Sequence, residues 1–135
     1  MTMVVGYVPK PEGLAALHAA IDQARWRGEA LYVVNVSSGQ AISDPSLASA
    51  EDLAAIRVTL EESGVPYQLD QHIGDLGGAA YVLDSADRLD AVLIVIGIRH
   101  RTATGKLITG SDAQRILLAA ECSVLAVKAP RAQSA

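Results

Sequence analysis

Residues 97–111 hold the residue types with the clearest chemical use in this chain. Three glycines, three cationic residues and a serine fall there: Gly97, Gly105, Gly110, Arg99, Arg101, Lys106 and Ser111. Glycine lets backbone N–H groups approach a ligand closely, and a helix that begins at Ser111 would direct its positive end towards an anion. His100 adds a ring N–H between the two arginines. The segment therefore predicts a phosphate site formed by Gly97, Arg99, His100, Gly110 and Ser111.

The same residues also have a purely structural explanation. Ser111 and Gln114 have the spacing of a capping box, in which both side chains satisfy the first N–H groups of a helix. The arginines also fit a solvated loop. Gly105 and Lys106 lack the remaining residues of a P-loop, and no G-x-G-x-x-G follows the first apolar run. Both interpretations of residues 97–111 stay open.

Apolar runs that alternate with helix-like stretches must position this segment. The alternation predicts a single α/β domain over residues 1–135, with an open, five-stranded, mostly parallel sheet and helices on both faces. The expected strands are residues 3–8, 31–36, 67–73, 91–96 and 123–128. Helical spacing of apolar residues occurs around residues 14–24, 49–63, 79–86 and 116–120, with stops at Gly28 and Gly64. Residues 67–73 alternate apolar and polar types, which predicts an edge strand.

Composition argues against several classes of function. A net charge of -4 disfavours binding to nucleic acid or to an anionic membrane, and no apolar run is long enough to span a bilayer. The single cysteine, Cys122, excludes an intramolecular disulfide and fits a cytoplasmic location. His18, His72 and His100 lack the spacing of metal ligands, and no nucleophile elbow is present. We expect no metal, no catalytic residue and no enzymatic activity.

The chain resembles the universal stress protein family. Residues 91–97, 110–111, 115–117 and 122–127 are similar to the C-terminal half of that family, and residues 4–17 to its first strand and helix. The resemblance implies a Rossmann-like, adenine nucleotide alpha hydrolase-like sheet with strand order 3-2-1-4-5. It also implies a homodimer through the last strand, Ser123 to Lys128, and in one branch ATP or AMP between the ends of strands one and four.

The nucleotide-binding branch of the family carries Gly, two residues, Gly, nine residues, then Gly and Ser or Thr. Gly97 and Gly110-Ser111 match this motif, whereas His100 replaces the second glycine. Val8 stands where that branch usually has an aspartate at the end of strand one, and Val36 matches the position beside the adenine.

Two hypotheses follow from this mixture of matches and departures. The first is a stress-response regulatory protein with a phosphate or adenine-nucleotide site after strand four. The second is a stress protein without nucleotide affinity that acts only as a homodimeric protein-protein interaction module, through its dimer surface and a loop at residues 37–48.

Overall fold

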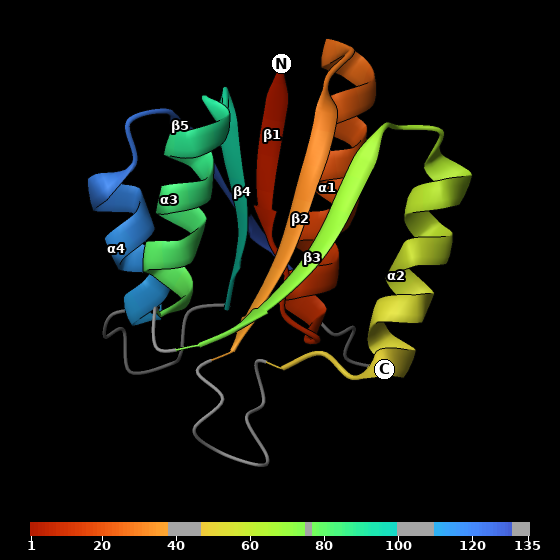
Figure 1. Cartoon of the computed structure of the whole chain (residues 1–135), viewed down its shortest axis with the longest axis horizontal. Coiled ribbons are helices and arrows are strands. Elements are labelled where there is room, and N and C mark those ends of the chain that lie inside the picture. The colour runs from red at the N-terminus through yellow and green to blue at the C-terminus, as the bar shows by residue number, and fades with distance from the viewer. Residues whose placement is uncertain (38–46, 75–76, 100–109, 131–135) are drawn as a thin grey trace.

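Five strands and four helices alternate along the part of the chain that the computed structural model describes, residues 1–37, 47–74, 77–99 and 110–130. The order is β1 (Thr2–Gly6), α1 (Pro11–Arg27), β2 (Ala30–Ser37), α2 (Ala50–Ser63), β3 (Tyr67–Ile73), α3 (Gly78–Leu89), β4 (Leu93–Ile98), α4 (Ser111–Ala119) and β5 (Ser123–Lys128). All strand pairs are parallel, in the order β3-β2-β1-β4-β5 (Figure 1). The predicted architecture and strand order are confirmed.

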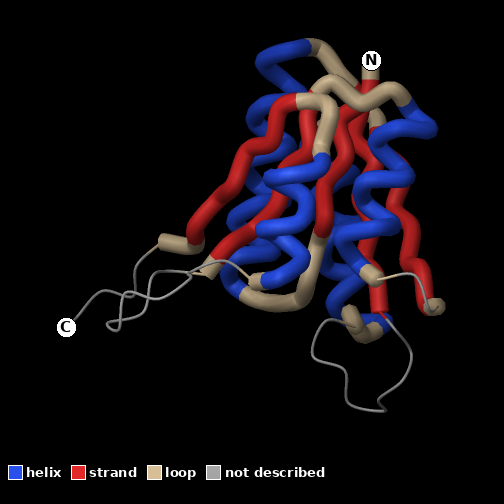
Figure 2. Tube along the Cα trace, turned by 90° about the vertical axis from the view of Figure 1, so that its left-hand side faces the viewer, coloured by secondary structure: helices blue, strands red, loops and turns tan. Residues whose placement is uncertain are grey.

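Helices cover both faces of the sheet, with α1 and α2 on one side and α3 and α4 on the other (Figures 1 and 2). Successive strand residues point to opposite faces, so Met3 and Val5 belong to the core beneath α1 and α2, and Val4 to the core beneath α3 and α4. All three side chains are fully buried. This two-sided burial explains why the central strands are continuous apolar runs.

β3 lies at the edge of the sheet, as its alternating sequence predicts. Its register pairs Tyr32 with Gln68 and Val36 with His72. The Tyr32 hydroxyl donates to Asp70 Oδ2 at 2.7 Å, so this face of β3 is held by polar contacts. Leu69, on the opposite face, packs against the core beneath α1 and α2.

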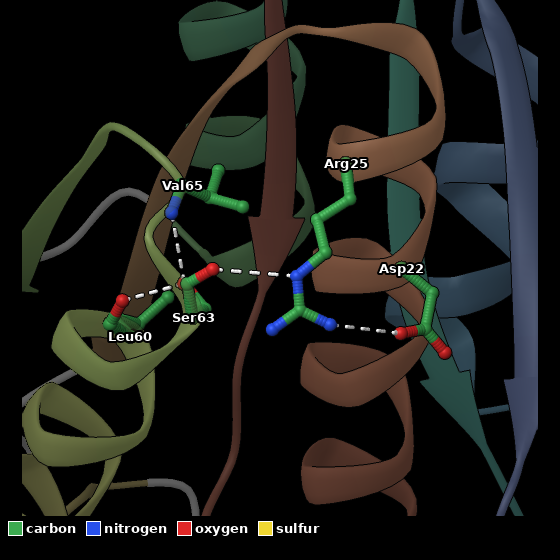
Figure 3. Close-up of polar contacts among 5 residues, drawn as sticks. All are labelled: Asp22, Arg25, Leu60, Ser63 and Val65. Carbon is green, nitrogen blue, oxygen red and sulfur yellow. Dashed lines mark hydrogen bonds and ion pairs between the residues drawn. The ribbon is translucent and has the colours of Figure 1, made fainter.

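The helices α1 and α2 end where glycine permits a left-handed turn, at Gly28 (φ 69°) and Gly64 (φ 76°). Near these ends, Arg25 Nε donates to the Ser63 carbonyl at 3.3 Å (Figure 3). Arg25 also lies 3.8 Å from Asp22, and Val65 N donates to Ser63 Oγ at 3.1 Å. The bond from Arg25 to Ser63 joins α1 to α2 at the amino end of the sheet.

Three strand boundaries differ from the sequence prediction by two residues. β1 ends at Gly6 rather than at residue 8, because the Lys10 N–H turns back to the Val8 carbonyl at 2.8 Å just before α1. β4 covers Leu93–Ile98 rather than residues 91–96, because Asp90 ends α3 in a left-handed conformation (φ 52°) and the next residues complete that turn. Gly97 therefore lies within the strand.

The predicted capping box at Ser111 is wrong. The N-cap of α4 is Gly110, which has an extended backbone, and the Gln114 N–H donates to the Gly110 carbonyl at 3.0 Å. Ser111 is thus the first helical residue. The helix consequently begins without a side-chain cap. Within the described ranges, no helix has both the length and the hydrophobicity to cross a membrane.

Candidate functional site

A pocket of about 110 Å³ opens at the carboxyl ends of β1, β2 and β4. The strand order reverses between β1 and β4, and the carboxyl edge at such a reversal is where open α/β sheets bind ligands. The pocket is lined by Gly6, Tyr7, Val8, Val34, Val36, Gly78, Val82, Ile96, Gly97, Asp112, Ala113 and Ile116.

The end of β1 creates one wall of this pocket. The last backbone-to-backbone hydrogen bond between the end of β1 and β2 runs from Tyr7 N to the Val34 carbonyl, at 2.9 Å. The chain then turns sharply at Val8, and a Cβ on Gly13 would lie 1.8 Å from the Val8 carbonyl oxygen. Glycine is therefore required at position 13 for α1 to begin so close to the strand.

Past the end of β1, the backbone of β2 has lost its neighbour on that side. The Val34 carbonyl faces β1, whereas the Ser37 carbonyl accepts from Gly74 N on the β3 side at 3.0 Å. Backbone direction alternates along a parallel strand, so the N–H and C=O of Val36 face the same side as those of Val34. Val36 thus directs a donor and an acceptor towards the pocket.

A buried amide holds this wall in place. Asn35 is fully buried, and its Nδ2 donates to the Tyr7 carbonyl at 2.9 Å. Asn35 Oδ1 accepts from Ala48 N and from Gln71 Nε2, both at 2.9 Å, and Gln71 also donates to the Ala48 carbonyl. The network fixes the end of β1 relative to β2 and β3, because Asn35 is fully buried and both its amide nitrogen and its amide oxygen are hydrogen-bonded.

Gly97 brings α1 against β4 on the side of the sheet away from α3. A Cβ on Gly97 would lie 2.2 Å from the Glu12 carbonyl oxygen and 2.5 Å from its carbon. Both clashing atoms belong to the backbone, so no side-chain rotation would relieve them. The packing of α1 against β4 is therefore enough to explain why residue 97 is glycine. The sequence alone suggests a different reason for this glycine, the close approach of a ligand.

The opposite wall combines the beginnings of two helices. α3 has Gly77 as its N-cap and α4 has Gly110, neither with a side-chain cap. A Cβ on Gly78 would lie 3.0 Å from Asp112 Oδ2 and 4.0 Å from Val36 Cβ. The Asp112 carboxylate, from the first turn of α4, therefore lies over the first turn of α3 and beside β2.

Three of the predicted site residues, Val8, Val36 and Gly97, line this one pocket. Gly110 is the N-cap of α4, and the first turn of α4 supplies part of the pocket lining. Arg99 directly follows β4 and is exposed. His100 lies outside the described residues, as do Arg101, Gly105, Lys106 and most of the 37–48 segment; the side chain of Ser111 is not described either.

Sequence reasoning missed Gly78 and Asp112. The pair Gly77-Gly78 before an apolar helix was a usable signal, since consecutive glycines often mark a close approach of backbone to another group. Asp112 carried no such signal, because an acidic residue in the first turn is ordinary for any helix.

The pocket suits part of a ligand rather than a whole one. Its walls are mainly aliphatic, and its volume is below the roughly 300–1,000 Å³ of most small-molecule sites. Among the described residues, no group of three or more His, Cys, Asp or Glu side chains is arranged to hold a metal ion.

The doubly wound sheet with its pocket at the β1/β4 reversal defines an adenine nucleotide alpha hydrolase-like domain. The family described as the Universal stress protein family matches residues 1–128. A universal stress protein of Mycolicibacterium smegmatis is 41% identical over 126 residues, which cover 93% of this chain and 96% of the relative. The chain belongs to the universal stress protein family.

Solved structures agree with this assignment. A universal stress protein from Archaeoglobus fulgidus superimposes with a TM-score of 0.78 at 32% identity, over 95% of this chain and 98% of that one. A structure of the universal stress protein from the same organism in complex with dAMP gives a TM-score of 0.63 at 25% identity, with the same coverage.

Proposed function

We propose that the protein is a non-enzymatic regulatory protein of the stress response, located in the cytoplasm, that binds an adenine nucleotide in the pocket beyond β1 and β4. The observation that carries this proposal is the convergence of Val8, Val36 and Gly97 on one slot at the switch point of the sheet. A relative with a similar fold has been solved with dAMP bound, which supports an adenine compound as the ligand.

The slot offers an adenine ring two kinds of contact. Val8, Val36 and Val82 supply aliphatic surface against its faces. The N–H and C=O of Val36 supply a donor and an acceptor for its edge, as backbone groups often do in such sites. The side chain of Val8 cannot hydrogen-bond to the ligand, so we expect affinity in the micromolar to millimolar range rather than tighter binding.

The lining supports binding rather than catalysis. Its described side chains include one carboxylate, Asp112, but no histidine, serine or cysteine that would form a nucleophile and base pair with it. The phosphate contacts from Arg99 and His100, and the choice between ATP and AMP, stay predictions from the sequence.

Calorimetric titration with adenosine, AMP and ATP tests the proposal. Gly78→Leu would direct a branched side chain towards Val36 and Asp112, and should abolish binding of each ligand that the unaltered protein binds. Gly77→Leu is the matched control, because a Cβ at Gly77 meets nothing within 4 Å. Dissociation constants above roughly 1 mM for all three ligands would refute nucleotide binding.

A second candidate function, homodimeric protein-protein interaction, rests on the other edge of the sheet. Within the described sheet β5 pairs with β4 alone, and Val124, Leu125 and Val127 are only partly buried. An open apolar edge strand favours pairing with a second chain. We propose that β5 (Ser123–Lys128) forms this contact, either together with nucleotide binding or in its place.

A further inference from the structure

We infer that Asp112 makes the pocket selective for adenine compounds with little or no phosphate charge, so that adenosine binds better than AMP and AMP better than ATP. The inference rests on the proposed function and narrows its ligand class. It follows from where the Asp112 carboxylate lies, between the beginnings of two helices and at the edge of the slot.

The carboxylate occupies the position that would otherwise attract an anion. Asp112 belongs to the first turn of α4, and its Oδ2 lies 3.0 Å from the position of a Cβ on Gly78, the first residue of α3. Each helix carries roughly half a positive charge at its N-terminus, so the two together are balanced by about one carboxylate. From the described residues, little positive potential remains at this wall for an incoming phosphate.

Other charges in the lining do not offset this carboxylate. Among the described residues that line the pocket, Asp112 is the one with a charged side chain. Arg99 follows β4, and its side chain does not line the slot. A phosphate at the beginning of α4 would therefore meet a negative group first.

The aliphatic slot and the Val36 backbone are indifferent to phosphate charge. They contact a neutral ring equally well in adenosine, AMP or ATP. Differences in affinity among the three ligands should therefore report on Asp112 rather than on recognition of the ring.

The experiment compares the full-length protein with Asp112→Asn and Asp84→Asn. Both substitutions remove one negative charge, but Asp84 is exposed on α3 and is not part of the pocket lining. Dissociation constants for adenosine, AMP and ATP are measured by calorimetry at low salt. Asp112→Asn should strengthen AMP binding by about fivefold to tenfold and ATP binding by at least as much, as expected for a phosphate a few ångströms from a lost carboxylate.

Adenosine binding should change by less than about threefold in Asp112→Asn, and Asp84→Asn should match the unaltered protein for all three ligands. Raising the salt concentration from about 20 to about 300 mM should strengthen AMP binding to the unaltered protein, because screening weakens repulsion. The opposite salt dependence would contradict the inference.

The measurements distinguish a failure of the inference about Asp112 from a failure of the proposed nucleotide binding. If AMP binds at least as tightly as adenosine and Asp112→Asn changes neither, the role of Asp112 is refuted while nucleotide binding stands. If neither the unaltered protein nor Asp112→Asn binds any of the three ligands, the proposed function fails and the inference falls with it. Binding of AMP to Asp112→Asn but not to the unaltered protein would support the role of Asp112 and contradict nucleotide binding by the unaltered protein.

Discussion

Replacing Gly97 by alanine should destabilise the protein through a contact between two backbones. The added Cβ would lie 2.2 Å from the Glu12 carbonyl oxygen, whereas ordinary contacts begin near 3.4 Å. β4 and the beginning of α1 must therefore separate by about 1 Å. Inserting a methylene into a packed interior typically costs about 1–3 kcal/mol. Because neither backbone can rotate away, we expect a loss in the upper half of that range.

Urea denaturation followed by circular dichroism measures the effect. The unfolding free energy should fall by about 2–3 kcal/mol, and the melting temperature by roughly 5–10 °C for a domain of this size. Gly6→Ala is the matched control in the neighbouring strand, because its Cβ would make ordinary contacts of 3.5 Å with Val82 and 3.7 Å with Ile96. The packing explanation is refuted if Gly97→Ala is as stable as Gly6→Ala.

Three further predictions concern the Asn35 network, Cys122 and the edge strand β5. Asn35→Ala should lower the unfolding free energy by about 2–4 kcal/mol, because buried partners lose their bonds; Gln68→Ala, at an exposed position, should change it by less than about 0.5 kcal/mol. Burial raises the pKa of the Cys122 thiol, so near pH 8 it should react with Ellman's reagent more slowly than glutathione does; equal rates would contradict this. Val124→Asp should yield a monomer by light scattering, with circular dichroism confirming that the fold persists; an unchanged dimer excludes β5 as the interface.

Local patterns were sufficient to predict the parallel α/β architecture, whereas the strand order came from the family resemblance. The apolar runs fixed the number of strands, and β3 and β5 have the bounds that the sequence predicts. The prediction for β4 was shifted because Ala91 and Val92 are apolar like the strand itself. In the structure they follow the left-handed turn at Asp90, and Val92 N donates to the Thr2 carbonyl at 3.0 Å.

The site residues near the ends of the parallel strands could be predicted from the sequence. Val8 follows β1, and Val36 and Gly97 lie near the carboxyl ends of β2 and β4, so their convergence follows from strand order. Asp112 was not predictable, since its place in the pocket depends on how α4 packs against α3, a contact between segments far apart in the sequence. Asn35, a lone amide in an apolar strand, was a signal that sequence reasoning passed over.

The Asn35 network has a consequence for protein engineering. It secures the chain on both sides of the connection between β2 and α2, through Asn35 before it and Ala48 after it, and Gly74 N adds a bond to the Ser37 carbonyl. Foreign peptides of different lengths spliced between Ser37 and Ala48 should therefore leave the register of β2 and the start of α2 unchanged. The scaffold offers a display position whose anchor points do not depend on what is displayed.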